Sequence, residues 1–245
     1  MRAIGAYVIF LKRLVTNREP FRVYVKLFFD ESVEIGINSL FIVSFISLFI
    51  GAVTSVQTTY NLLSPFIPLY VVGTITRDMT LLELAPTFTG VVFAGKIGSH
   101  IAGQLGTMRI TEQIDALEVM GINSASYLVL PKILAGLFMY PLLVILSAFL
   151  CIYGGYLAGI LADLFTKDDY IIGLRYDYND FKITFMMIKS YVYGFLITSI
   201  SAFQGYYTRG GALEVGQAST TAVTNSCIAI LLADFGLAQL FSVYL

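Results

Sequence analysis

The stretch ILAGLFMYPLLVILSAFLCIYGGYLAGILA, residues 133–162, contains no Asp, Glu, Lys or Arg. Three further runs, residues 35–76, 190–208 and 215–233, are also free of these four residue types. Because a helix of about 20 largely apolar residues crosses a bilayer, each run has about the length of a membrane span or more. The strands of a membrane β-barrel would alternate between apolar and polar residues, and these runs do not. The sequence therefore predicts an all-α integral membrane protein.

The composition of the whole chain excludes a soluble single domain. Of its 245 residues, 57% are apolar and only 13% are charged, whereas a soluble domain carries about 25% charged residues. The 15 basic and 16 acidic residues nearly balance. Net charge therefore gives no reason to expect a nucleic-acid partner.

Five membrane spans are predicted within a single membrane domain, residues 1–245. They cover approximately residues 36–57, 82–104, 127–162, 183–206 and 215–241. The apolar part of residues 1–34 is too short to span and is followed by basic side chains, so we expect an interfacial helix there. Residues 62–76 contain Pro65 and Pro68 and are expected to form a loop or a re-entrant piece. If this segment crossed the membrane, every later loop would change sides.

The distribution of basic residues predicts that the N-terminus lies in the cytoplasm. Five spans then give the cytoplasmic side Arg2, Lys12, Arg13, Arg18, Arg22, Lys26, Arg109, Lys132 and Arg209. The outer side receives Arg77, Lys167, Arg175 and Lys182. This orientation agrees with the excess of Lys and Arg that cytoplasmic loops carry.

Small residues recur at every fourth position of the second span, at Ala94, Gly98, Ala102 and Gly106. Such a stripe lets two helices approach closely in lipid. The stripe is expected either to pack against another helix of the same chain or to form a contact between two copies of the chain.

A polar segment with helical composition, residues 106–122, follows the second span. Thr111 is expected to cap a short helix, and Gly121 is expected to end it in the left-handed conformation. The acidic residues of this helix recur at every third position and share one face: Glu112, Asp115 and Glu118. That face is either a solvated surface or a docking surface for a basic cytoplasmic partner.

Ionisable side chains within a span are costly and usually functional. Polar side chains in the outer parts of the predicted spans are Gln57, Glu83, Lys189 and Asp234. Glu83 and Lys189 share a depth in this topology, so they either neutralise one another in a packed bundle or form a polar patch for a lipid headgroup. Lys96 lies nearer the cytoplasmic end and is expected to brace the polar segment 106–122.

The sequence offers little for catalysis. The run GVVFAGKI, residues 90–97, nearly matches a phosphate-binding P-loop, but Ile97 occupies the position that requires Ser or Thr. His100 is the only histidine, and neither Cys151 nor Cys227 belongs to a C-x-x-C pair, so no metal site is expected.

Several short blocks follow one another along the chain: ELAP at 83–86, AGKIG at 94–98, LGTM at 105–108, EQIDALEVMG at 112–121 and YLVLPK at 127–132. Further blocks are QGY at 204–206, GGA at 210–212, VG at 215–216 and ASTTAV at 218–223. Together these blocks resemble the central and C-terminal signatures of the MlaE-type permeases. The resemblance extends over approximately residues 51–241.

This resemblance implies the membrane subunit of an ABC transporter that moves phospholipids between the inner and outer membranes. It implies three protein partners: a second copy of this chain, a cytoplasmic ABC ATPase and a periplasmic MCE-type lipid-binding protein. ATP and Mg²⁺ would bind in the ATPase, and no cofactor is expected in this chain, which would lie in the inner membrane. The resemblance assigns ATPase coupling to Arg109, Glu112, Gln113, Asp115, Glu118 and Gly121. A membrane-embedded lipid-modifying enzyme and a membrane scaffold are the alternatives.

Overall fold

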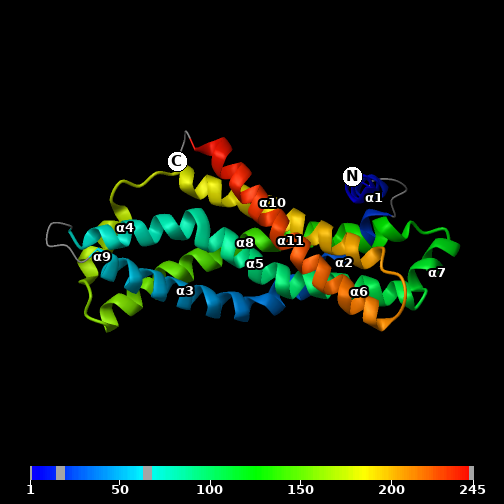
Figure 1. The fold of residues 1–245 in the computed structure, drawn as a ribbon, viewed down its shortest axis with the longest axis horizontal. Helices are drawn as coiled ribbons and strands as arrows, with labels where there is room; N and C mark the ends of the chain where they lie inside the picture. The colour runs from blue at the N-terminus through cyan, green and yellow to red at the C-terminus, as the bar shows by residue number, and fades with distance from the viewer. Residues whose placement is uncertain (1, 15–19, 63–67, 243–245) are drawn as a thin grey trace. The chain divides into compact units, whose positions relative to one another are not determined.

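The computed structural model describes residues 2–14, 20–62 and 68–242, and all the regular secondary structure in these ranges is helical (Figure 1). Within them, five helices are long and apolar enough to cross a membrane. They are Arg22–Asn61, Tyr70–Ile110, Ser124–Leu161, Phe181–Tyr206 and Ala212–Phe241. The predicted all-α fold with five spans is thus confirmed.

The chain divides into two compact units, each assembled from three separate segments. The first unit contains residues 1–39, 90–140 and 191–235, and the second contains residues 40–89, 141–190 and 236–245. Long helices such as α8 (Ser124–Leu161) therefore contribute one part to each unit. A single membrane domain over residues 1–245 stays a prediction.

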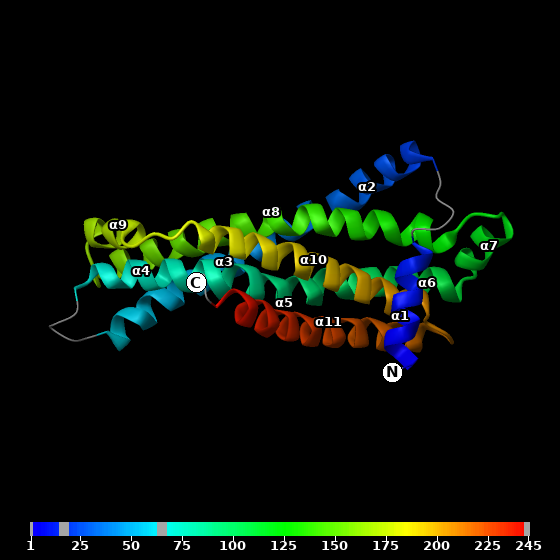
Figure 2. The same cartoon turned by 90° about the horizontal axis from the view of Figure 1, so that it is seen from above.

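The N-terminal region contains two helices, α1 (Arg2–Arg13) and α2 (Phe21–Ile35). Residues 15–19, which include Arg18, lie outside the described part of the chain. Figure 2 shows α1 running across the end of α10 (Phe181–Tyr206). Phe10 is fully buried there against a cluster of aromatic rings, those of Phe203, Tyr206 and Tyr207. Its neighbours Val8 and Ile9 are exposed, as an interfacial helix requires.

The second long helix begins earlier than predicted. Its elements are α4 (Tyr70–Met79), η2 (Thr80–Phe88), α5 (Thr89–Phe93), η3 (Ala94–Gly98) and α6 (Ser99–Ile110). Residues 70–76 were expected in a loop or re-entrant piece but form most of α4. The reason is that Pro68 precedes the first turn, where its missing N–H costs nothing. Its carbonyl accepts the backbone N–H of Val71 at 3.1 Å. Pro65, within residues 63–67, lies outside the described residues.

Two wide, π-helical turns interrupt this helix, η2 and η3. Pro86 lies inside η2 and has no N–H to donate to the helical hydrogen-bond ladder. Such π-helical insertions occur frequently at functional sites. Glu83 lies in the same π-helical stretch as Pro86.

The second unit contains a very close helix crossing between α3 (Leu40–Asn61) and α8. A Cβ atom added to Gly51 would lie 1.8 Å from the backbone oxygen of Cys151. A Cβ atom added to Gly154 would lie 2.1 Å from the backbone oxygen of Leu48. Glycine on both helices is thus required for this approach, as is common between membrane helices.

Helix α9 (Lys167–Arg175) lies in the polar region between the third and fourth spans, where no helix was predicted. A capping box between Thr166 and Asp169 begins this helix. Helix α9 packs against α4 (Figure 1). Burial raises the pKa of the Tyr170 hydroxyl well above its usual value, so this group stays protonated and donates to the Ile152 carbonyl at 3.1 Å.

Arg77, assigned to an outer loop above, is buried in α4. Its guanidinium pairs with Asp78 at 2.9 Å. It also donates to the carbonyls of Leu174 and Tyr176, at 3.0 and 2.8 Å. Arg77 therefore satisfies two backbone acceptors at the end of α9, where the last carbonyls of a helix have no intrahelical donor.

The small-residue stripe of the second span packs within the first unit. Ala94 and Ala102 are fully buried. A Cβ atom on Gly98 would lie 2.9 Å from the Ser201 hydroxyl, and one on Gly106 would lie 3.1 Å from the Val215 side chain. This stripe therefore serves contacts inside the chain, and it provides no support for a seam between copies.

Candidate functional site

The predicted coupling segment, residues 106–122, consists of the end of α6, a tight turn and α7 (Gln113–Val119). Glu112 precedes α7 in the left-handed conformation with φ of 61°. The predicted Thr111 cap is wrong, because the Thr111 hydroxyl donates to the Thr107 carbonyl of the preceding helix at 2.8 Å. Gly121 has φ of 81° and ends the segment in the predicted left-handed conformation.

Two side chains of the predicted acidic face have partners in the first unit. The Asp115 carboxylate pairs with Arg109 at 2.6 Å and stays about half exposed. The Glu118 carboxylate accepts from Ser124 at 2.9 Å and from the Tyr206 hydroxyl at 3.1 Å. Glu118 therefore ties α7 to α8 and α10, while Asp115 and Glu112 remain exposed.

The tip of the segment carries an exposed apolar pair that sequence reasoning missed. The side chains of Val119 and Met120 are 89% and 66% exposed, whereas Ile114 on the same helix is fully buried. Exposed apolar side chains flanked by charged ones are typical of a protein-binding surface. Gln113 takes no part in the tip, because its amide donates to the Thr111 hydroxyl at 3.1 Å.

Glu83 and Lys189 meet in the second unit, as their shared depth predicted. The Lys189 ammonium lies 2.8 Å from the Glu83 carboxylate and 2.8 Å from the Leu82 carbonyl. Lys189 is fully buried, with its charge 4.8 Å from the centre of the Phe185 ring, whereas Glu83 is half exposed. The Glu83 carboxylate therefore lies at the surface of the chain, while the Lys189 ammonium beneath it is buried.

The other predicted site residues have separate surroundings. Gln57 lines a pocket of about 370 Å³ in the second unit, together with Thr54, Asn61 and Met79. Asp234 belongs to the first unit, where its carboxylate accepts the Tyr193 hydroxyl at 2.7 Å.

Lys96 donates to the Asn38 carbonyl, at the junction that leads into α3. The contact found for Lys96 is thus with the first span, and its support of the coupling segment stays a prediction. In the described ranges, no group of three or more His, Cys, Asp or Glu residues is arranged to hold a metal ion.

Five helices that are long and apolar enough to cross a membrane define a multi-pass membrane protein. The family model described as "Permease MlaE" matches residues 28–240. The chain belongs to the MlaE family of ABC transporter permeases. Permease subunits of this class are not catalytic, and ATP hydrolysis takes place in a separate subunit.

Two relatives support this assignment along nearly the whole chain, and a third supports it over about two thirds of the chain. A "Probable ABC transporter permease protein" of Rickettsia bellii is 35% identical over 98% of this chain and 92% of its own length. The "Intermembrane phospholipid transport system permease protein MlaE" of Haemophilus influenzae is 28% identical over 96% of this chain and 90% of its own length. "Protein TRIGALACTOSYLDIACYLGLYCEROL 1, chloroplastic" of Arabidopsis thaliana is 34% identical over 65% of this chain and 45% of its own length.

Proposed function

We propose that this chain moves phospholipids between the inner and outer membranes of a diderm cell. It would lie in the inner membrane as a pair of copies, with its N-terminus in the cytoplasm. A cytoplasmic ABC ATPase would bind ATP and Mg²⁺, and a periplasmic MCE-type protein would exchange lipid with the permease. The Haemophilus influenzae relative, whose name states phospholipid transport, supports the cargo.

The observation that carries this proposal is the Glu83–Lys189 pair within membrane-spanning helices. A buried ammonium with an outward carboxylate is a polar feature in otherwise apolar surroundings. It suits the zwitterionic or anionic headgroup of a phospholipid, whose acyl chains require apolar surfaces. The alternative of mutual neutralisation predicts the same geometry, so a transport measurement has to separate them.

The test of the proposed function is reconstitution of the chain with its ATPase in liposomes. We expect the two proteins to purify together and phospholipid to stimulate ATP hydrolysis. Fluorescent phospholipid should move to acceptor vesicles only when ATP and the MCE-type protein are present. Co-purification without any lipid stimulation or transfer would exclude phospholipid as the cargo.

The exposed tip of α7 should dominate ATPase binding. Replacing Val119 and Met120 by Asp should weaken association with the ATPase by roughly tenfold or more, because buried apolar anchors each contribute about 1 kcal/mol or more to an interface. Pull-down of the ATPase from detergent, followed by its ATP hydrolysis rate, measures the effect. Glu118 is left intact, since its contacts with Ser124 and Tyr206 hold the helix in place.

A matched control replaces Leu161 and Ile172 by Asp. These side chains are similarly apolar and exposed, 84% and 53%, but lie on the predicted outer side. The control should retain normal association. Equal loss in both variants would indicate general destabilisation, and normal association in the tip variant would remove α7 from the interface.

A further inference from the structure

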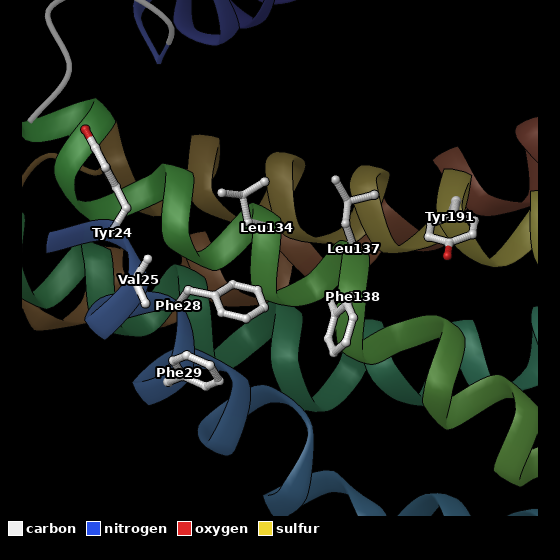
Figure 3. A pocket seen from close by; sticks show the side chains of 8 residues that line it. All are labelled: Tyr24, Val25, Phe28, Phe29, Leu134, Leu137, Phe138 and Tyr191. Atoms are coloured by element: carbon white, nitrogen blue, oxygen red, sulfur yellow. The ribbon is translucent and has the colours of Figure 1, made fainter. Parts of the chain in front are cut away.

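An apolar groove of about 500 Å³ lies in the first unit between α2 and α8 (Figure 3). Its main lining residues are Val25, Phe28, Phe29, Leu134, Leu137 and Phe138. The ring centres of Phe28 and Phe138 lie 5.9 Å apart between the two helices. Tyr24 and Tyr191 complete the lining, and the Tyr24 hydroxyl contacts the Ser126 hydroxyl at 2.8 Å.

The groove is open and carries no charged side chain in its lining. Phe29 on α2 and Phe138 on the membrane-spanning helix α8 are 63% and 57% exposed. The volume falls within the range of roughly 300–1,000 Å³ that ligand sites have. An apolar ligand from the bilayer would gain contact with several rings at once.

The N-terminal end of α2 is cationic. Arg22 lies three positions before Val25, and Lys26 lies three positions before Phe29, so each basic residue neighbours a groove residue on the helix surface. Both side chains are exposed, and neither has an ion pair with any residue that the structure describes. Side chains on a helix lean toward its N-terminus, which directs both charges to that end of the groove.

The carboxylates of α2 lie farther along the helix. Glu31 pairs with Lys132 at 2.5 Å, and Glu34 lies 3.6 Å from His100. Asp30 follows Lys26 by one turn and is exposed. The apolar groove therefore has cations at one end. This combination complements an amphipathic ligand with an anionic headgroup.

We propose that this groove binds one acyl chain of an anionic phospholipid, whose phosphate is held by Arg22 and Lys26. The basic side chains extend to the level of the headgroups while their stems cover the apolar surface. This site shares no residue with the Glu83–Lys189 pair and does not depend on the identity of the transported lipid. It would fix a lipid against α2 and α8.

Tryptophan fluorescence provides a direct test, because the natural chain contains no Trp. The variant Phe29→Trp places one reporter in the groove of the full chain, reconstituted in liposomes. Phosphatidylglycerol with brominated acyl chains should quench it at lower mole fraction than brominated phosphatidylcholine. We expect roughly a fivefold preference for each cation engaged, since a basic residue near an anionic surface contributes about 1 kcal/mol.

Two matched variants control this experiment. Phe149→Trp places the reporter on α8, where the native ring is 65% exposed and lies within the charge-free run 133–162, and it should show no lipid preference. Arg22→Gln with Lys26→Gln should abolish the preference at position 29. Lys167→Gln with Arg175→Gln removes the same charge from α9 and should leave that preference intact. Equal quenching by both lipids at position 29 would overturn the proposal.

A second measurement tests the assembled transporter. Phe138 is replaced by the photoreactive benzoylphenylalanine, and the complex is irradiated in a membrane that contains phosphatidylglycerol. We expect a phospholipid adduct on the chain, detected by its mass. An adduct with a second copy or with another protein would show that a protein covers the groove, and would overturn the proposal.

Discussion

The double variant Glu83→Gln, Lys189→Met should lose most lipid transfer, by roughly tenfold or more, while the transporter still assembles. Hydrogen bonds to charged groups contribute about 1.5–3 kcal/mol each, and a phospholipid headgroup would lose such contacts in the variant. Removing both charges together leaves no unpaired ion in the span, so folding should be preserved. ATP-dependent transfer in reconstituted liposomes measures the loss.

The matched control replaces an exposed pair, Glu34→Gln with His100→Gln. These side chains lie 3.6 Å apart and are both over two-fifths exposed, so their replacement should leave transfer unchanged. Normal transfer by the Glu83 and Lys189 double variant would assign the pair a purely structural role. Loss of assembly would be seen as loss of the co-purified ATPase before any transfer is measured.

The single replacements should differ in stability. Glu83→Gln leaves the fully buried Lys189 ammonium without its counter-charge, whereas Lys189→Met leaves a carboxylate that is already half exposed. Breaking a buried pair from one side costs about 3–5 kcal/mol, so Glu83→Gln should lower the thermal unfolding temperature more than Lys189→Met. The reverse order would mean that Lys189 is stabilised chiefly by the Leu82 carbonyl and the Phe185 ring.

The second large effect is expected at the crossing of α3 and α8. Gly51→Val should prevent stable folding of the second unit, because even a Cβ atom would lie 1.8 Å from the backbone oxygen of Cys151. The obstruction is backbone, which cannot turn aside as a flexible side chain can. Overpacking in a core costs about 1–3 kcal/mol, occasionally more, and this contact belongs at the upper end. Monodispersity in detergent and the unfolding temperature report the change.

Gly216→Ala is the matched control for this substitution. Gly216 also lies in a long helix, α11 (Ala212–Phe241), and a Cβ atom there would have no neighbour within 4 Å. Alanine in an open helical position should be neutral or stabilise by roughly 0.5–1 kcal/mol. If Gly51→Val behaved like this control, α3 and α8 would have to cross differently in the membrane.

The number and order of the spans could be predicted because lipid requires long apolar runs that no soluble helix needs. The start of the second long helix could not be predicted. Pro68 was interpreted as a break in a helix, whereas it lies just before the first turn. Helix α9 was missed because its stability comes from packing against α4 and from the contacts of Arg77. Neither produces a periodic pattern of apolar residues within residues 167–175.

The site was predictable where topology alone fixes depth, as for Glu83 and Lys189. It was not predictable where local geometry decides. The left-handed Glu112 displaced the expected Thr111 cap, and Glu118 turned toward Tyr206 on a helix far along the chain. The sequence did contain a signal for the exposed pair Val119 and Met120, because both apolar residues directly precede Gly121, which ends the helix. Composition alone does not show whether such side chains are buried or exposed.

Neither compact unit is encoded by one continuous stretch of chain, and this has a consequence for biogenesis. Glu83 is synthesised 106 residues before Lys189, which corresponds to roughly 5–20 s at ordinary translation rates. During that interval the carboxylate enters the bilayer without its ammonium partner, and the first unit still lacks residues 191–235. Neither unit can therefore reach its final packing before α10 has been synthesised.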